Sequence, residues 1–176
     1  MKGYTLIEVI ISLLLITIIL LGGTALFYQN LKSSGLSDVD LGLTSSLRSI
    51  LSIIEKDIRF GQVTSVGNGF RIDCVSAGSV GYSGNSLIVN DLVGLETIYN
   101  LDNGQIASIS SQTGNKEFIS PMEIDVSRLS FTWFCQGSVN DKIKVEIDAR
   151  NEVLGSGIGV TRSVSTEINM LNSGIN

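Results

Sequence analysis

The apolar and polar positions of this chain divide it into three stretches with different periodicities. The first stretch runs from Val9 to Leu31, twenty-three residues without a formal charge. As a helix it would be about 35 Å long, enough to cross a hydrocarbon core of about 30 Å. We therefore predict a membrane-spanning helix. Because Lys2 and the amino terminus carry the only positive charges before it, the positive-inside rule places residues 32–176 outside the cytoplasm.

The second stretch repeats its apolar residues at the spacing of one helical face. The repeating residues are Leu36, Val39, Leu43, Leu47, Ile50, Leu51, Ile54 and Ile58. This pattern predicts that the helix continues to about Phe60. Gly35 and Gly42 weaken it, since each glycine costs about 1 kcal/mol relative to alanine inside a helix.

In the third stretch, from Gln62 onward, apolar residues alternate with polar ones, which is typical of strands. The pattern predicts strands at 70–75, 87–89, 95–99, 105–109, 129–134, 143–147 and 158–171. Asp102-Asn103-Gly104 predicts a hairpin turn, because Asn and Gly tolerate the positive φ that tight turns need. We predict an α+β fold in which a long N-terminal helix packs on an antiparallel sheet.

Composition excludes several classes of function. The net charge is −5, so the chain lacks the basic surface that nonspecific nucleic-acid binding needs, and we expect no direct nucleic-acid binding. Histidine is absent, which removes the commonest general base and the commonest metal ligand. With no recognisable nucleophile motif either, we predict that the protein is not an enzyme, with no catalytic residue and no cofactor.

The two cysteines, Cys74 and Cys135, match neither a redox C-x-x-C spacing nor a paired zinc-ligand spacing. Both fall in predicted strands or at a strand end. Outside the cytoplasm they are candidates for a disulfide, and the alternative is that both are buried as small apolar residues.

An acid, Glu8, stands at the threshold of the apolar run. A charge at the centre of a spanning helix costs about 2.5 to 3.5 kcal/mol on insertion scales, and less near the interface. Glu8 therefore needs an explanation. One explanation is that it sits at the level of the lipid headgroups, where the positive end of the helix dipole favours it.

The residues around Glu8 suggest another explanation. Gly3-Tyr4-Thr5-Leu6-Ile7-Glu8-Val9, a short basic leader before it and an apolar run after it resemble the processing motif of type IV pilins and type II secretion pseudopilins. The resemblance implies that prepilin peptidase cuts between Gly3 and Tyr4, and that the new amine of Tyr4 is N-methylated. It also implies that Glu8 neutralises the terminal amine of a neighbouring subunit when the helices bundle, so that Glu8 acts in assembly.

The resemblance implies a domain order. Residues 1–3 would be the leader, 4–31 the transmembrane and assembly helix, 32–60 its amphipathic continuation, and 61–176 an extracytoplasmic β-rich domain. The expected partners are prepilin peptidase, other pilin or pseudopilin subunits, the inner-membrane assembly platform and the membrane. The expected location is the cytoplasmic (inner) membrane, crossed once, and then a pilus or pseudopilus.

Looser matches resemble minor pilins of the W type and minor pseudopilins of the J type. They lie at residues 47–59, 129–133 and 163–169. The resemblance thus predicts a minor subunit of a filament that serves adhesion, motility, DNA uptake or protein secretion. The alternative is a membrane-anchored extracytoplasmic binding module that does not polymerise.

Three further patterns have ordinary structural explanations. Asp38-Val39-Asp40 and the turn at 100–104 offer oxygen ligands, but neither has the spacing of an EF-hand, so we predict no metal site. Arg48, Lys56 and Arg59 are interspersed with acids and predict a mixed exposed helix face. Phe131 and Trp133 alternate with Thr132, which favours a core-facing strand over a ligand platform.

Overall fold

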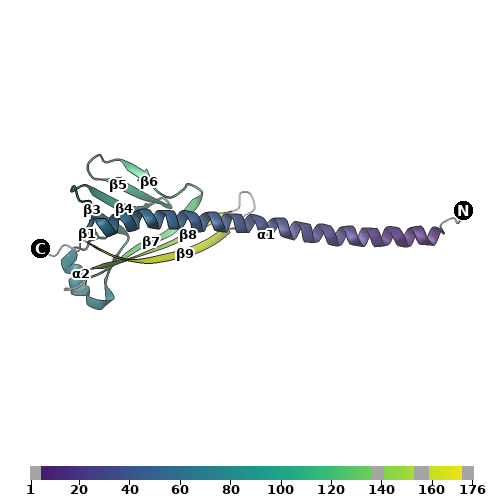
Figure 1. Cartoon of the computed structure of the whole chain (residues 1–176), viewed down its shortest axis with the longest axis horizontal. Coiled ribbons are helices and arrows are strands. Elements are labelled where there is room, and N and C mark those ends of the chain that lie inside the picture. Colours follow the sequence, from purple (N-terminus) through teal and green to yellow (C-terminus); the bar gives the residue numbers. More distant parts are fainter. Residues whose placement is uncertain (1–4, 136–140, 153–158, 172–176) are drawn as a thin grey trace. The chain divides into compact units, whose positions relative to one another are not determined.

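A computed structural model describes residues 5–135, 141–152 and 159–171. The chain forms two compact units, Met1–Asp38 and Val39–Asn176, and the boundary falls within the long helix α1 (Leu6–Phe60). Figure 1 labels the elements along the chain. The predicted helix end at Phe60 is confirmed.

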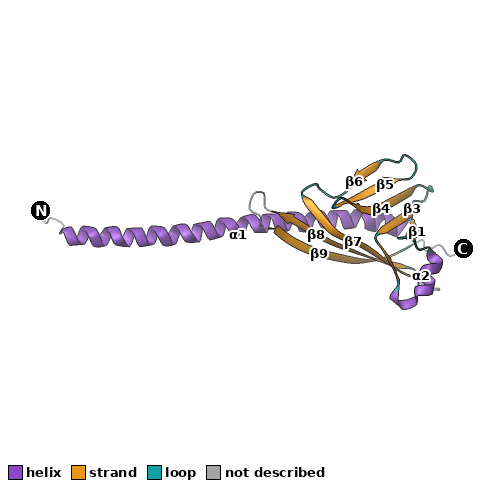
Figure 2. Cartoon of the chain, turned by 180° about the vertical axis from the view of Figure 1, so that it is seen from behind, coloured by secondary structure: helices purple, strands orange, loops and turns teal. Residues whose placement is uncertain are grey.

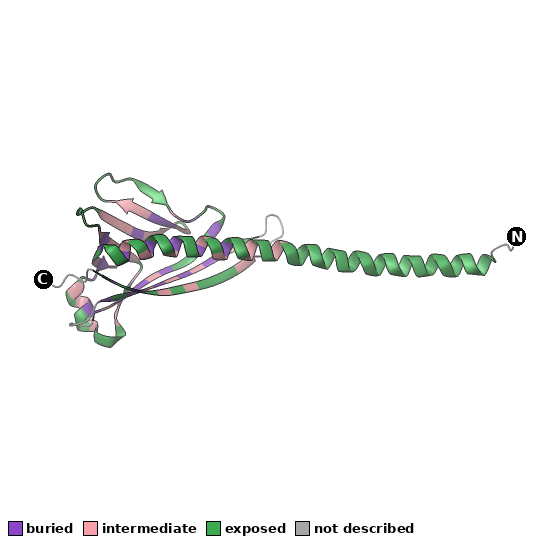
Figure 3. Ribbon diagram, viewed as in Figure 1, coloured by how far each residue is buried: buried purple, intermediate pink, exposed green. Residues whose placement is uncertain are grey.

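In the second unit, α1 buries one stripe of side chains. Its buried residues are Leu43, Leu47, Ile50, Ile54 and Ile58, each at most 1% exposed. They recur every three or four positions, so they lie on one face of the helix, as predicted. Figure 3 shows this buried stripe on α1. Val39 and Leu51, from the same predicted face, are half-buried.

Helix α1 ends where the chain must turn sharply. The backbone N–H of Gly61 donates to the carbonyl of Asp57, 2.8 Å away. A Cβ at Gly61 would lie 2.6 Å from both that carbonyl oxygen and Val89 Cγ1. Only glycine fits this approach of the helix end to the sheet, so the chain enters the first strand directly after it.

The described strands form two antiparallel sheets (Figure 2). One sheet has the order β1 (Gln62–Val66), β3 (Ser86–Asn90), β4 (Glu96–Asp102), β5 (Gln105–Ser110) and β6 (Lys116–Phe118). The other has the order β2 (Tyr82–Gly84), β7 (Ile124–Phe134), β8 (Lys142–Glu152) and β9 (Gly159–Asn169). The architecture is α+β, as the sequence predicted.

The core lies between the buried stripe of α1 and the two sheets. Its largest fully buried side chains include Tyr99 on β4 and Phe131 and Trp133 on β7, each at most 1% exposed. The prediction that Phe131 and Trp133 face the core is confirmed. The hydroxyl of Tyr99 donates a 2.6 Å hydrogen bond to Asp57 Oδ2 on α1, which links β4 to the helix.

The predicted hairpin at residues 102–104 is also confirmed. Asp102 pairs with Gln105 across β4 and β5, so Asn103 and Gly104 form a two-residue loop. Both have positive φ, 49° and 77°, as a type I′ turn requires.

One predicted strand is wrong. Residues 70–75 fall mainly in a helix, α2 (Arg71–Ala77), which a short 3₁₀ turn, η1 (Gly78–Val80), follows. The carboxylate of Asp73 accepts a 2.8 Å hydrogen bond from the backbone N–H of Phe70 and closes the first turn. Only Cys74 of this segment is buried, whereas Phe70 and Ile72 are 60% and 75% exposed. The alternation of apolar residues therefore did not reflect a buried strand face.

Candidate functional site

The first described turn of α1 joins Thr5 to Glu8. Both the backbone N–H and the hydroxyl of Thr5 donate to Glu8 Oε2, at 3.1 Å each. In return, the backbone N–H groups of Glu8 and Val9 donate to the carbonyl of Thr5 at 3.1 and 3.3 Å. Thr5-x-x-Glu8 has the sequence of a capping box, and the carboxylate satisfies an amide at the helix start. Glu8 thus has a role within its own helix.

The hydroxyl groups within the apolar run bond to the backbone of the same helix. Ser12 Oγ donates to the carbonyl of Glu8 at 2.8 Å. Thr17 Oγ1 lies 2.8 Å from the carbonyl of Leu14, and Thr24 Oγ1 lies 3.0 Å from those of Leu20 and Leu21. These three are the only hydroxyl residues between Val9 and Phe27. Because each is satisfied locally, they do not expose unpaired donors to hydrocarbon.

The same helix is apolar around its whole circumference. The large apolar side chains from Leu6 to Leu31 are 49% to 80% exposed within their own unit. In length and composition α1 meets the requirements for crossing a membrane. A helix with no polar face needs lipid or other apolar helices around it, so the first unit is compatible with a single-pass membrane anchor.

The predicted cleavage site, Gly3 and Tyr4, lies outside the described residues. The chain next to it is described, and there the Glu8 carboxylate is hydrogen-bonded to the amide of Thr5, the residue directly after Tyr4. Cleavage before Tyr4 would create an ammonium group on the residue directly before the amide that this carboxylate accepts from.

Residues 1–24 match the family model described as the prokaryotic N-terminal methylation motif. The chain carries this motif. The match is consistent with the type IV pilin and pseudopilin family, and the motif implies processing by prepilin peptidase. No curated protein and no solved structure is significantly similar to the chain.

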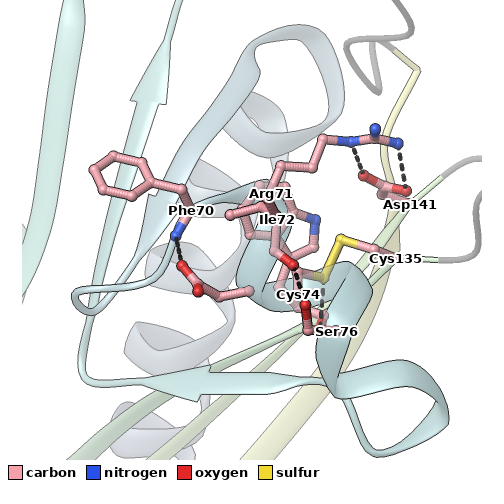
Figure 4. The surroundings of a disulfide bond; sticks show 9 residues. Phe70, Arg71, Ile72, Cys74, Ser76, Cys135 and Asp141 are labelled. Atoms are coloured by element: carbon pink, nitrogen blue, oxygen red, sulfur yellow. Dashed lines mark hydrogen bonds and ion pairs between the residues drawn. A yellow bond between two sulfur atoms is a disulfide. The ribbon is translucent and has the colours of Figure 1, made fainter.

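Away from the methylation motif, the structure joins Cys74 on α2 to Cys135, one residue after β7 (Figure 4). Cys74 lies in a helix and not in the predicted strand. Beside the bond, Arg71 Nε lies 3.2 Å from Oδ2 of Asp141, whose side chain is 1% exposed. The disulfide and this ion pair together attach α2 to the end of the β7–β8 sheet.

Two of the three acids weighed as calcium ligands, Asp40 and Asp102, are engaged in ion pairs. Arg162 on β9 donates to both carboxylate oxygens of Asp40 at 2.5 Å, and this hydrogen bond lowers the pKa of Asp40. Asp102 pairs with Lys116. Within the described residues, no group of three or more His, Cys, Asp or Glu side chains could hold a metal ion.

Sequence reasoning missed three of these features. The Thr5–Glu8 cap has a local signal, the T-x-x-E pattern before an apolar run, which could have revealed it. The pairs Asp40–Arg162 and Arg71–Asp141 join residues that are far apart along the chain, so no local pattern predicts them.

Proposed function

We propose that the chain is a minor pilin or pseudopilin subunit that is cut after Gly3, methylated at Tyr4 and assembled into a filament like a type IV pilus. The observation that carries the proposal is the methylation motif at residues 1–24 at the start of an exposed apolar helix. Such a helix is stable in lipid before assembly and can be covered by neighbouring helices afterwards. The proposed function requires no catalytic residue.

Two sequence features support a minor subunit over a major pilin, and the looser matches at 47–59, 129–133 and 163–169 make the W or J type the proposed kind. Major pilins commonly have a proline in the apolar helix, whereas Pro121 is the only proline here. They also commonly have a disulfide near the C-terminus, whereas no cysteine follows Cys135. In this proposal residues 61–176 lie outside the cytoplasmic membrane, and the partners are other pilin-like subunits and the inner-membrane assembly platform.

The experiment is to determine the N-terminus of the protein isolated from its own cell envelope. We expect N-methylated Tyr4 as the first residue. In a Gly3→Val variant the residue before the cut is no longer small, so we expect the unprocessed chain to accumulate. A Lys2→Arg variant keeps the basic leader and should be processed normally.

An intact Met1 in the wild-type protein, or normal processing of Gly3→Val, would contradict the proposal. Either result would favour the alternative, a membrane-anchored binding module that does not polymerise.

A further inference from the structure

Strand β9 is the outermost strand of its sheet and remains long and regular (Figures 1 and 2). It pairs with β8 from Gly159 to Asn169 without a register shift. The opposite edge of β9 makes no backbone hydrogen bond to any residue that the structure describes. β9 thus presents a free row of backbone donors and acceptors.

The other edges are much less suited to pairing. β2 and β6 have three residues each, and β1 has five with a register shift between Val63 and Ser65. Short strands and bulges are the means by which proteins prevent edge pairing. β9 has eleven residues, no bulge and no proline. Among these four strands, β9 alone is left open over its full length.

A groove of about 400 Å³ lies between this open strand and helix α1. It is lined by Arg48, Leu51, Ser52 and Glu55 of α1 and by Val164, Ser165 and Thr166 of β9. In a strand added to β9, every second side chain would point to the side of the sheet that α1 covers. These side chains would enter the groove, while the backbone paired with β9.

The side chains of the groove indicate which residues it would accept. Leu51 and Val164 are half-buried against the core and offer an apolar surface. Glu55 is already paired with Arg59. Arg48, in contrast, has no ion-pair partner within the described residues. The charge available for binding is therefore positive.

We propose that an extended segment of a different polypeptide chain adds to the outer edge of β9. It places an apolar side chain against Leu51 and Val164 and a carboxylate against Arg48. A second copy of β9 fits this groove less well. Its groove-side residues are Val160, Arg162, Val164, Thr166 and Ile168, none of which is an acid. The proposal does not rest on processing or polymerisation of the chain.

The test uses the full chain purified in detergent and a fluorescent synthetic peptide, Thr-Asp-Thr-Val-Thr-Val-Thr. This peptide places Asp and two Val residues on one side when extended. We expect saturable binding, measured by fluorescence anisotropy, together with slower hydrogen exchange of β9 amides. N-methylation of the alternate amides that face β9 should abolish binding, whereas N-methylation of the other alternate set should leave it intact.

The charge is tested with a matched pair of variants. Arg48→Glu should weaken binding of the Asp peptide about fivefold and strengthen binding of a peptide with Lys in place of Asp. Lys56→Glu makes the same charge change on the same helix but outside the groove, and should change neither affinity.

Three results would overturn the proposal. The first is no binding at millimolar peptide. The second is an equal loss of affinity for the Asp peptide in Arg48→Glu and Lys56→Glu, or an equal effect of the two N-methylation patterns on binding. Either result would show that the peptide is attracted nonspecifically. The third is a dimer of the chain that protects β9 and excludes the peptide, because the occupant would then be a second copy.

Discussion

At the scale of single residues, a hydrogen bond between two elements of the core allows a specific prediction about stability. Tyr99 is 1% exposed, and its hydroxyl donates to Asp57 on α1. A hydrogen bond to a charged group contributes about 1.5 to 3 kcal/mol. This hydrogen bond adds to the core packing that joins the five-stranded sheet to the helix, so its loss should be measurable in the stability of the second unit.

Tyr99→Phe should lower the free energy of unfolding by about 1.5 to 3 kcal/mol, because the Asp57 carboxylate loses the hydroxyl group that donates to it. Trp133 is the only tryptophan and is buried, so its fluorescence reports unfolding of this unit in urea. Tyr82→Phe is the matched control, since the Tyr82 hydroxyl has no partner within the described residues. Equal stability of the two variants would contradict the prediction.

The same tyrosine predicts a dependence on alkaline pH. Burial, and secondly the hydrogen bond to Asp57, raise the pKa of Tyr99 above its usual value. The folded state therefore retains a proton that the unfolded state loses above about pH 10. This contribution to stability is complete below pH 10 and falls as the pH rises further. Unfolding measured from pH 8 upward should show a smaller alkaline loss in Tyr99→Phe than in the wild type.

At the scale of elements, local patterns predicted those elements that are long enough to repeat their apolar pattern several times. The apolar stripe from Leu36 to Ile58 predicted that α1 continues to about Phe60, and the alternation in β7 predicted that Trp133 is buried. β2 and β6, at three residues each, are too short to show a period. In α2, alternating apolar residues masked a helix whose first turn depends on Asp73. The division into two sheets depends on pairing between distant strands, which no local pattern contains.

The disulfide is the element-scale feature with the largest predicted effect. Cys74 and Cys135 are 61 positions apart, and a crosslink over such a loop stabilises by about 4 kcal/mol in the chain-entropy model. We expect that the double variant Cys74→Ser, Cys135→Ser lowers the free energy of unfolding by about that amount. The measurement is urea unfolding followed by Trp133 fluorescence.

The control for the disulfide is chemical. Protein recovered from the native envelope should show no free thiol until it is reduced, and reduction should reproduce the stability of the double variant. Two thiols that titrate in the unreduced protein would show that both cysteines are merely buried.

At the scale of the whole molecule, the two units differ in how their apolar side chains are removed from water. The second unit buries its own apolar side chains, from the stripe on α1 to Trp133 on β7. The described part of the first unit has no buried apolar residue, and the hydroxyl groups of Ser12, Thr17 and Thr24 in its apolar run bond to the backbone of the same helix, so lipid or other helices must surround it. Glu8 is a charged residue at the start of this apolar helix. We expect that replacing it affects assembly of the subunits rather than folding of the second unit.

Two substitutions at Glu8 separate its two roles. Gln keeps an oxygen that accepts from Thr5 but removes the charge, whereas Ala removes both. If Glu8 pairs with the Tyr4 ammonium of a neighbouring subunit, Gln and Ala should both block incorporation into filaments. If it only caps its own helix, Gln should behave as the wild type and Ala alone should be impaired.

We expect the first outcome. Glu8→Gln removes a charge that insertion disfavours, so membrane integration and cleavage after Gly3 should persist. Incorporation should fall by about two or more orders of magnitude, because leaving one member of a buried ion pair without its partner costs about 3 to 5 kcal/mol. The measurement is co-purification of processed Glu8→Gln subunit with filament components at equal membrane abundance. Recovery equal to the wild type would show that Glu8 serves only as a helix cap.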